Sequence, residues 1–460
     1  MSVPVALPAA GEGRAASRAG RRYLVRTFGC QMNEHDSERV AGLFEADGMV
    51  AAQTLDEADV VFVNTCCVRE NADNRLYGTL GHLKAAKARH PGLRIVVGGC
   101  LAQKDRDLVR QRAPWVDVVF GTHNLARVLD LLDQAEESGP VTEVLEDSPA
   151  GERAVSDLPV RRELAHSAWV TITVGCNNAC TFCIVPIVRG PEISRRPGEI
   201  IRQVQSLAAD GVVEVTLLGQ NVNSYGRDLG VDGRHRPVFA DLLRRVGEVP
   251  GIRRVRFTSP HPKDMREDVA RAMAETPAVC EQLHLPLQSG SARILRAMRR
   301  GYTPQRFLSR LRMVQAAVSG LAASTDVMVG FPGETEADFR ATLAVMEEAR
   351  FDGAFMFVYS PRPGTPAAHL SGQVDPAEAA ERFSRLADLQ QRISLEKNRA
   401  LVGREVEVLT EGPSRKDPQV ATARTRSNKV VHFPGSYPAG RFLTVVVERA
   451  APSHLMARLA

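Results

Sequence analysis

Six of the eight cysteines in this chain form two sets of three, and the placement of these sets constrains the fold. The first set, Cys176, Cys180 and Cys183, occupies one loop directly after the apolar run 169–174. The second set is dispersed along the chain, and each member follows its own apolar run: Cys30, Cys66 and Cys100 after 23–28, 60–63 and 94–97. Helical stretches separate these runs, and such alternation predicts parallel α/β sheets.

The dispersed cysteines are expected to converge. The carboxyl ends of neighbouring parallel strands meet at one edge of a sheet, where Cys30, Cys66 and Cys100 would then lie together. Three thiolates can hold a cubane [4Fe-4S] cluster and leave one iron open to another ligand. The alternative is three unrelated buried cysteines, because free cysteine is among the most buried residues. We expect Cys66 rather than its neighbour Cys67 to be the ligand, and Cys280 to serve packing.

The compact set has the spacing CxxxCxxC at the carboxyl end of a strand, where barrel folds place their active sites. We expect it to hold a second [4Fe-4S] cluster with one open iron. The alternative is a zinc site, but structural zinc needs a closed tetrahedral shell, and the sequence offers no fourth ligand nearby.

The apolar pattern predicts an α/β fold class with three folded parts. Residues 22–137 would form an open parallel α/β sheet domain, 138–161 a linker, 162–392 a partial TIM-type (β/α)6 barrel, and 393–460 a small antiparallel β-barrel. Central strands are expected at 169–174, 213–218, 254–257, 282–285, 324–329 and 354–358, and helices at 34–46, 70–89, 198–210, 239–246 and 376–398. Residues 1–21 are expected to be a disordered tail with a weak likeness to a transit peptide; Pro4 and Pro8 interrupt any secretory signal.

Composition narrows the class of protein. Apolar residues make up 44% and charged residues 25%, and no run of 18 apolar residues occurs, so we expect no membrane association. Grouped cysteines in a long chain favour metal binding in a reducing compartment, so we expect a cytoplasmic protein. We also expect a monomer. The net charge of +5 permits a nucleic-acid partner without requiring one.

Several motifs together resemble the methylthiotransferases of the radical S-adenosylmethionine (SAM) superfamily. They are TFGCQMNEHDS at 27–37, NTC at 64–66, GCLAQ at 99–103, the segment 175–196, PLQSGS at 286–291 and VGFPGET at 329–335. The resemblance implies that SAM chelates the open iron of the compact set and is cleaved to a 5′-deoxyadenosyl radical. It also implies that the cluster on Cys30, Cys66 and Cys100 supplies sulfur, that one SAM methylates this sulfur, and that a second gives the radical.

The resemblance extends to the substrate. The C-terminal barrel looks like a TRAM domain, an RNA-binding module. The QMN variant at 31–33 and the segment 425–433 resemble family members that modify carbon 2 of N(6)-dimethylallyladenosine at position 37 of tRNA, next to the anticodon. Near neighbours act on threonylcarbamoyl-adenosine or on an aspartate of a ribosomal protein. A different class, an RNA-binding protein with closed, non-catalytic clusters, stays as the alternative.

Partners and further site residues follow from the resemblance. Expected partners are tRNA, an external one-electron donor of the flavodoxin or ferredoxin type, and iron–sulfur assembly machinery. SAM is expected near Gly219, Gln220, Asn221, His284, Gln288, Gly330 and Glu334, and RNA near Arg424, Arg426 and Lys429. Arg189, Arg195 and Arg196 would contact the SAM carboxylate or RNA phosphates. For the first two sets an ordinary structural role is the competing interpretation, and for the last three arginines it is a solvated basic stretch.

Overall fold

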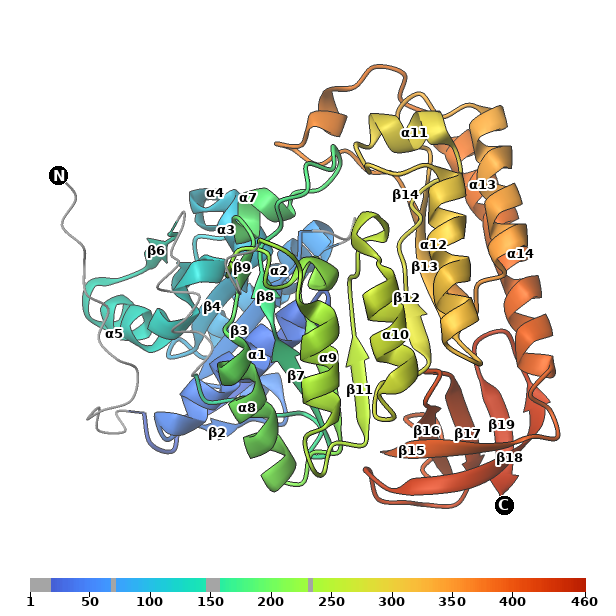
Figure 1. Ribbon diagram of the computed structural model, residues 1–460. Helices are drawn as coiled ribbons and strands as arrows, with labels where there is room; N and C mark the ends of the chain where they lie inside the picture. The colour runs from blue at the N-terminus through green and yellow to red at the C-terminus, as the bar shows by residue number, and fades with distance from the viewer. Residues whose placement is uncertain (1–17, 68–71, 146–157, 231–234) are drawn as a thin grey trace. The chain divides into compact units, whose positions relative to one another are not determined.

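The computed structural model describes residues 18–67, 72–145, 158–230 and 235–460, which divide into two compact units (Figure 1). The first unit comprises residues up to Glu163 together with 174–177 and 184–193. The second comprises 164–173, 178–183 and 194–460. The short strands β8 (Thr173–Val174) and β9 (Ile193–Ser194) lie where the chain crosses between the units.

The first unit is built on a six-stranded parallel sheet in the order β2-β1-β3-β4-β5-β6. Its strands are β1 (Arg22–Phe28), β2 (Val50–Ala51), β3 (Val60–Thr65), β4 (Arg94–Gly99), β5 (Val118–Phe120) and β6 (Val141–Glu143). Its helices are α1 (Gln31–Ala46), η1 (Leu55–Glu57), α2 (Ala72–Arg89), α3 (Cys100–Asp105), α4 (Asp107–Arg112), η2 (Thr122–Arg127), α5 (Val128–Ser138) and α7 (Val185–Arg189).

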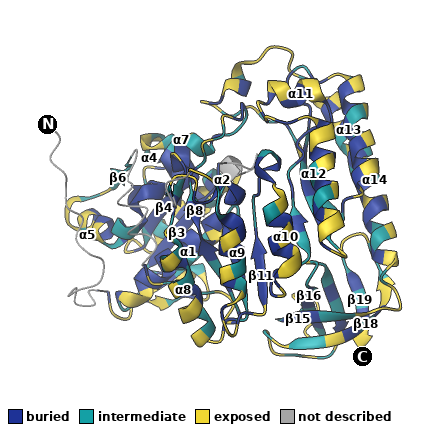
Figure 2. Cartoon of the chain, in the orientation of Figure 1, coloured by how far each residue is buried: buried dark blue, intermediate teal, exposed yellow. Residues whose placement is uncertain are grey.

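Alternate strand residues fill two separate cores in this unit. Val61 and Val63 pack into one core, whereas Val60 and Phe62 of the same strand pack into the other. Successive strand side chains point to opposite faces, so a strand apolar at every position must be covered on both faces. Strands β3 and β4 are accordingly buried along nearly their whole length (Figure 2).

The second unit contains two three-stranded parallel sheets, β11-β10-β7 and β12-β13-β14. A parallel bridge between Val255 and Val279 continues the strand series from β11 toward β12. The strands are β7 (Ser167–Thr171), β10 (Glu214–Leu218), β11 (Arg254–Phe257), β12 (Gln282–His284), β13 (Ala322–Val329) and β14 (Gly353–Val358). These six strands correspond to those expected from the sequence, and the predicted α/β fold class is confirmed.

Helices alternate with these strands and cover them. They are α8 (Pro197–Ala209), η3 (Val222–Ser224), α9 (Phe239–Gly247), η5 (Pro262–Asp264), α10 (Glu267–Glu275), α11 (Ala292–Ala297), α12 (Pro304–Ala317), α13 (Glu336–Ala349), η6 (Pro366–His369) and α14 (Pro376–Arg399). Helices α12 to α14 each bury one face and expose the other (Figure 2). That pattern is expected of helices laid over a parallel sheet.

The C-terminal barrel closes through the order β15-β16-β17-β19-β18. Its strands are β15 (Glu405–Pro413), β16 (Val420–Thr425), β17 (Val430–Pro434), β18 (Phe442–Ala450) and β19 (Leu455–Leu459). One expectation was wrong in detail: β17 and β19 pair in parallel, so the barrel is not wholly antiparallel. Consecutive hairpins would pair β17 with β18. In this barrel β18 pairs with β15 and β19, so β17 borders β19.

Two boundary predictions also need correction. The expected linker 138–161 contains β6, which pairs in parallel with β5 because Val141 N–H donates to Asp117 O at 2.8 Å. The expected tail ends earlier than residue 21, because the Arg18 guanidinium is buried against Asp47 at 2.9 Å. Residues 1–17 and 146–157 lie outside the described residues. Within the described residues no helix is long and apolar enough to cross a membrane.

Candidate functional site

The dispersed cysteines follow three adjacent strands of the first unit in matching register. Phe28 of β1 pairs with Thr65 of β3, and Thr65 pairs with Gly99 of β4. Cys66 and Cys100 therefore leave the sheet at the same level, and Cys30 one residue later. The sheet brings their thiols close enough for Cys30 to hydrogen-bond with Cys66 and to interact electrostatically with Cys100. The sheet topology thus gathers cysteines that are far apart in sequence.

Two asparagines that the sequence interpretation missed hold this arrangement together. Asn33 Oδ1 accepts from Cys30 Sγ at 3.5 Å and lies 3.9 Å from Cys100 Sγ. Asn33 Nδ2 donates to Asn64 Oδ1 at 2.8 Å, and Asn64 Nδ2 donates back to Asn33 O at 2.7 Å. Both asparagine side chains are buried. The sequence feature that could have indicated their role is their position next to the cysteines, in the QMN and NTC motifs.

Glycines allow the backbones to approach each other at this edge. Gly99 has φ +93°, and a Cβ there would lie 2.2 Å from Asn64 Oδ1. A Cβ on Gly29 would lie 2.7 Å from Cys66 Cβ. Any larger residue at either position would push the asparagine or the cysteine out of place.

A buried cation faces the thiols. Arg189 is only 7% exposed, and its Nη2 pairs with Asp36 Oδ2 at 2.7 Å. A hydrogen bond from the Cys66 thiol and the charge of Arg189 lower the pKa of Cys30 to about 6, against the opposing effect of burial. A hydrogen bond with Cys67 and the same arginine lower the pKa of Cys100. Thiolates are the form that binds iron, so this environment suits an iron–sulfur cluster.

The position of Arg189 corrects one expectation. It does not lie on an exposed basic stretch, because its ion pair with Asp36 is buried within the first unit. Arg195 donates to Thr171 O at 2.8 Å and to Gln203 Oε1 at 2.7 Å, both in the second unit. Both arginines therefore have intramolecular partners that the sequence pattern did not indicate.

Cys67 differs from its neighbour. Hydrogen bonding with Cys100, together with burial, raises its pKa well above the ordinary value, and its side chain packs in an apolar core. The expectation that Cys66, rather than Cys67, is the cluster ligand stays a prediction. Among the described residues, no group of three or more His, Cys, Asp or Glu side chains is spaced to hold a single metal ion. A four-iron cluster spreads its thiolates more widely than a single ion does.

The compact cysteine loop spans both units: Cys176 belongs to the first, and Cys180 and Cys183 to the second. In the first unit, Cys176 N–H donates to Gly190 O at 3.2 Å. The preceding Gly175 has φ +77°, and a Cβ there would lie 2.0 Å from Pro191 O. Glycine is therefore required at the turn that leads into the cysteines.

In the second unit, the loop is tied to the end of α11. Thr181 N–H donates to Met298 O at 3.1 Å, and Thr181 Oγ1 donates to Ala297 O at 3.0 Å. The buried guanidinium of Arg300 donates from Nη1 to Cys180 Sγ at 3.3 Å, and its Nε donates to the Tyr302 hydroxyl at 3.1 Å. Arg300 therefore places a positive charge directly beside this sulfur.

A buried histidine lies beside this group and was missed by the sequence interpretation. The His261 ring contacts the Tyr302 ring edge-on, with centroids 5.8 Å apart, and Lys263 N–H donates to His261 Nδ1 at 3.1 Å. Burial, with Arg300 and Lys263 nearby, lowers the pKa of His261 to about 2. A neutral ring that accepts at Nδ1 carries its proton on Nε2, which is buried without a partner among the described residues. Its signal was the TSPHP turn directly after β11.

The predicted residues after β10 lie in the same unit. Asn221 Nδ2 donates to Asp264 Oδ2 at 2.9 Å, and Asp264 follows His261 on η5. Gln220 Oε1 and Asn221 Oδ1 are buried without partners among the described residues. Gly219 lies close to β8, since a Cβ there would lie 2.5 Å from Thr173 Cγ2. Buried polar atoms of this kind are costly unless a ligand or water satisfies them.

Other predicted cofactor residues have structural partners. His284 Nε2 lies 3.3 Å from Asp326 Oδ1, and its Nδ1 lies 3.0 Å from Ser324 Oγ. The Gln288 backbone, at φ +69°, bonds to Asp326 and Met328 of β13. Their prediction as SAM contacts stays a prediction.

Gly330 and Glu334 are explained by packing. The Glu334 side chain is fully buried in an ion pair with Arg382 at 3.0 Å, and it accepts from Gly330 N–H at 2.8 Å. Gly330 has φ +74°, and a Cβ there would lie 2.9 Å from Ala379 Cβ on α14. The structure thus uses both residues to join the β13 loop to α14, and their prediction as SAM contacts stays a prediction.

Two of the three basic residues expected to bind RNA, Arg426 and Lys429, dock the C-terminal barrel. Arg426 pairs with Glu281 at 2.8 Å, and Lys429 pairs with Asp352 at 2.7 Å. Arg424 pairs with Glu411 at 2.6 Å. The expectation that they contact RNA stays a prediction, and these ion pairs argue against it for Arg426 and Lys429.

The strand side of the docking surface is also basic. The fully buried Arg254 donates to Arg424 O at 2.9 Å. Arg256 donates to Thr425 O at 2.9 Å and to Arg426 O at 2.8 Å. Both arginines lie on β11, and Arg254 begins it. The barrel is therefore seated at the amino end of β11, whereas His261 follows the carboxyl end of that strand.

Comparison with known proteins defines the class. Residues 22–121 match the family described as Uncharacterized protein family UPF0004, 170–346 match the Radical SAM superfamily, and 399–460 match the TRAM domain. A radical SAM methyltransferase from Kitasatospora setae, TsrM, shares the fold with a TM-score of 0.54 at 14% identity, over 76% of this chain and 75% of that one. OxsB, a cobalamin-dependent SAM radical enzyme, gives 0.51 at 12% identity, over 81% of this chain and 56% of the other. The match over 170–346 places this part of the chain in the Radical SAM superfamily.

Full-length relatives narrow the family. The tRNA-2-methylthio-N(6)-dimethylallyladenosine synthase of Parafrankia sp. (strain EAN1pec) is 56% identical over 95% of this chain and 90% of its own length. The synthases of the same name from Frankia alni and Mycobacterium tuberculosis (strain ATCC 25177 / H37Ra) are 57% and 56% identical over 95% and 97% of this chain, and 88% and 83% of their own lengths. The chain belongs to this synthase family, and the resemblance drawn from its motifs is confirmed.

Proposed function

We propose that this protein is a tRNA-modifying transferase that adds a methylthio group to carbon 2 of N(6)-dimethylallyladenosine at position 37. The observation that carries the proposal is the identity of 56% over 95% of the chain with synthases named for this product. The two cysteine sets at strand carboxyl ends support it, because both thiol environments suit iron–sulfur clusters.

The residues present fit two [4Fe-4S] clusters. Cys30, Cys66 and Cys100 would hold the auxiliary one, and Cys176, Cys180 and Cys183 would hold the one that also binds SAM. When bound, the clusters and SAM supply the sulfur atom, the methyl group and the radical that removes the carbon-2 hydrogen. The protein's own groups would position these components and exclude water.

Each buried group has a definable role in this scheme. Arg189 would offset the negative charge of the auxiliary site, and Arg300 would do the same at Cys180. The Nε2–H of His261 would donate to an acceptor atom of SAM or of the target adenine. The unpartnered oxygens of Gln220 and Asn221 would accept from an amino group of SAM or of the adenine. A neutral histidine suits this role, because it neither adds charge nor exchanges a proton near neutral pH.

The proposal also names partners. The target base must leave its stack and enter the pocket, which costs less in an anticodon loop than in a duplex. The TRAM domain would hold the tRNA body, an electron donor of the flavodoxin or ferredoxin type would reduce the SAM-binding cluster, and iron–sulfur assembly machinery would load both clusters. The protein would act in the cytoplasm as a monomer.

The test is direct. The anaerobically reconstituted chain is mixed with SAM, a reductant and an anticodon stem-loop that carries N(6)-dimethylallyladenosine, and the nucleosides are measured by mass spectrometry. Formation of the 2-methylthio nucleoside is expected, with none from an unprenylated or threonylcarbamoylated stem-loop. SAM cleavage without product from the prenylated RNA would refute the proposal.

A further inference from the structure

A long arginine-rich segment lies next to the cysteine loop of the second unit. Residues 282–325 contain seven arginines, no lysine and no aspartate or glutamate. The chain as a whole is nearly balanced, with 59 basic and 54 acidic residues. So long a segment without an acid leaves most of its arginines without a nearby counter-charge.

Some of these arginines have partners. Arg293 pairs with Asp338 and Arg312 with Glu348, so both are neutralised by acids outside the segment. Arg300 is buried against Cys180. The remaining ones, Arg296, Arg299, Arg306 and Arg310, have no acidic partner among the described residues. Arg310 makes a weak contact with Met313 Sδ at 4.0 Å.

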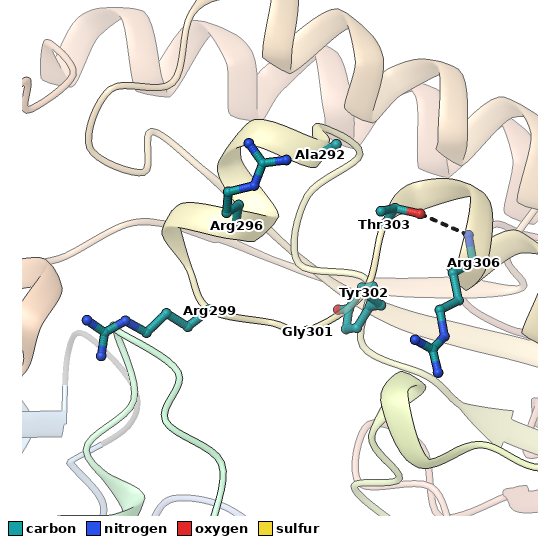
Figure 3. A pocket seen from close by; sticks show the side chains of 7 residues that line it. All are labelled: Ala292, Arg296, Arg299, Gly301, Tyr302, Thr303 and Arg306. Atoms are coloured by element: carbon teal, nitrogen blue, oxygen red, sulfur yellow. Dashed lines mark hydrogen bonds between the residues drawn. The ribbon is translucent and has the colours of Figure 1, made fainter.

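Three of these four arginines line one hollow. Arg296 on α11, Arg299 just after it and Arg306 on α12 border a surface depression of about 490 Å³ together with Gly301 and Thr303 (Figure 3). All three arginines are exposed, and none forms an ion pair within the described residues. Figure 3 shows their guanidinium groups pointing apart rather than at one spot. That arrangement suits an extended polyanion better than one small anion.

The hollow is linked to the candidate active site through its own backbone. Arg299 and residues 301–303 line the hollow, whereas Arg300 between them turns inward to Cys180. Arg299 adopts φ +54° and Gly301 φ +71°, so the chain makes the sharp turns that this alternation needs. A strand of nucleic acid held here would have its bases within reach of the cysteine loop.

We propose that this hollow is a phosphate-binding track for the backbone of the substrate RNA. The inference rests on the proposed function, because it takes the substrate to be an anticodon loop, and it assigns the phosphates on one side of the target base to Arg296, Arg299 and Arg306. Arginine suits this role, because its planar guanidinium offers paired donors to phosphate oxygens. The track is separate from the C-terminal barrel, whose Arg426 and Lys429 are engaged in docking.

The experiment measures the salt dependence of RNA binding. The holoenzyme and its Arg296→Ala, Arg299→Ala and Arg306→Ala variants, alone and combined, are titrated with a prenylated anticodon stem-loop by fluorescence anisotropy over a series of salt concentrations. Each lost contact with single-stranded RNA should reduce the slope of log K against log salt by about 0.7, and the triple variant by about 2. At 0.1 M salt this corresponds to about fivefold weaker binding for each arginine.

Controls separate a specific track from general charge. Arg271→Ala removes one exposed arginine from α10, outside the segment, and should leave the slope unchanged. Arg306→Lys should retain most of the slope, because the charge is kept. An unchanged slope in the triple variant, or an equal loss in Arg271→Ala, would overturn the proposal.

The same samples separate this inference from the proposed function. If the parental chain forms the methylthio product while the triple variant keeps the full salt slope, the track is wrong and the function stands. If the slope falls as expected while the parental chain forms no product from any stem-loop, the track stands and the assigned reaction is wrong.

Discussion

The buried pair of Arg382 and Glu334 gives a sharp prediction about stability. Its side chains are 1% and 0% exposed, and the carboxylate receives only Arg382 Nη1 and Gly330 N–H, while its Oε1 has no partner among the described residues. Burial raises the pKa of Glu334, against the opposing effects of Gly330 and Arg382. The substitution Arg382→Met keeps most of the volume and leaves this carboxylate with one donor.

The cost has an upper limit set by protonation. An uncompensated Glu334 can take up a proton, and from an unfolded-state pKa of about 4.3 this costs about 3.7 kcal/mol at pH 7 and about 1.6 kcal/mol at pH 5.5. Loss of one partner of a buried ion pair costs about 3–5 kcal/mol, in the same range. Because the folded-state pKa lies above the unfolded one, the variant regains stability as the pH falls. We expect a deficit of about 3–4 kcal/mol at pH 7 that shrinks by about 2 kcal/mol at pH 5.5.

The assay uses the two tryptophans of the chain. Trp115 lies in the first unit and Trp169 on β7 of the second, so a Trp115→Phe background makes urea unfolding report on the second unit. Arg385→Met on the same helix removes an exposed partner of Glu336 and should barely change the midpoint. The double variant Arg382→Met with Glu334→Gln should recover much of the loss at pH 7. A deficit that is the same at both pH values would refute the reasoning, because Glu334 would then not be the destabilised group.

Three further predictions concern the site. Cys66→Ala should lower the iron bound after anaerobic reconstitution by about half and stop methylthio transfer, while SAM cleavage continues. Cys67→Ala should keep both clusters. Swapped outcomes would reverse the ligand assignment. His261→Phe should lower product formation at least tenfold with unchanged iron content, and His261→Gln should restore part of it, because glutamine can still donate; a fully active phenylalanine variant would remove the histidine from the pocket. Arg426→Ala should lower the thermal midpoint more than it lowers RNA affinity, and the reverse result would return this residue to the RNA surface.

Local patterns were sufficient for much of the architecture. The apolar run 254–257 forms a strand and the helical pattern 376–398 forms a helix, both within one residue of the expected bounds. Strand and helix periodicity depends on residues that are neighbours in sequence. Strand β6 was missed, because a three-residue edge strand carries little periodicity, and its pairing with β5 depends on the folded sheet. The parallel pair β17 and β19 was missed for a similar reason.

Site residues divide along the same line. The six cysteines are predicted as cluster ligands from their spacing and from their position after strands, and the register of β1, β3 and β4 explains how three of them meet. Charge alone did not reveal the ion pair of Arg426, because a basic residue on a barrel looks the same in sequence whether it faces solvent or Glu281. His261 and Arg300 were missed, because their roles depend on neighbours that are far away along the chain.

The sequence by itself therefore determined the fold class and the family, since periodicity, glycine-dependent turns and motif spacing are local properties. Only the tertiary structure decided which charges are engaged. It buries Arg189 on Asp36, Arg382 on Glu334 and Arg254 under the C-terminal barrel, yet leaves Arg296, Arg299 and Arg306 around one hollow. The physical reason is that the energy of a charge depends on its partners and its burial, and both are set by segments that meet only when the chain has folded.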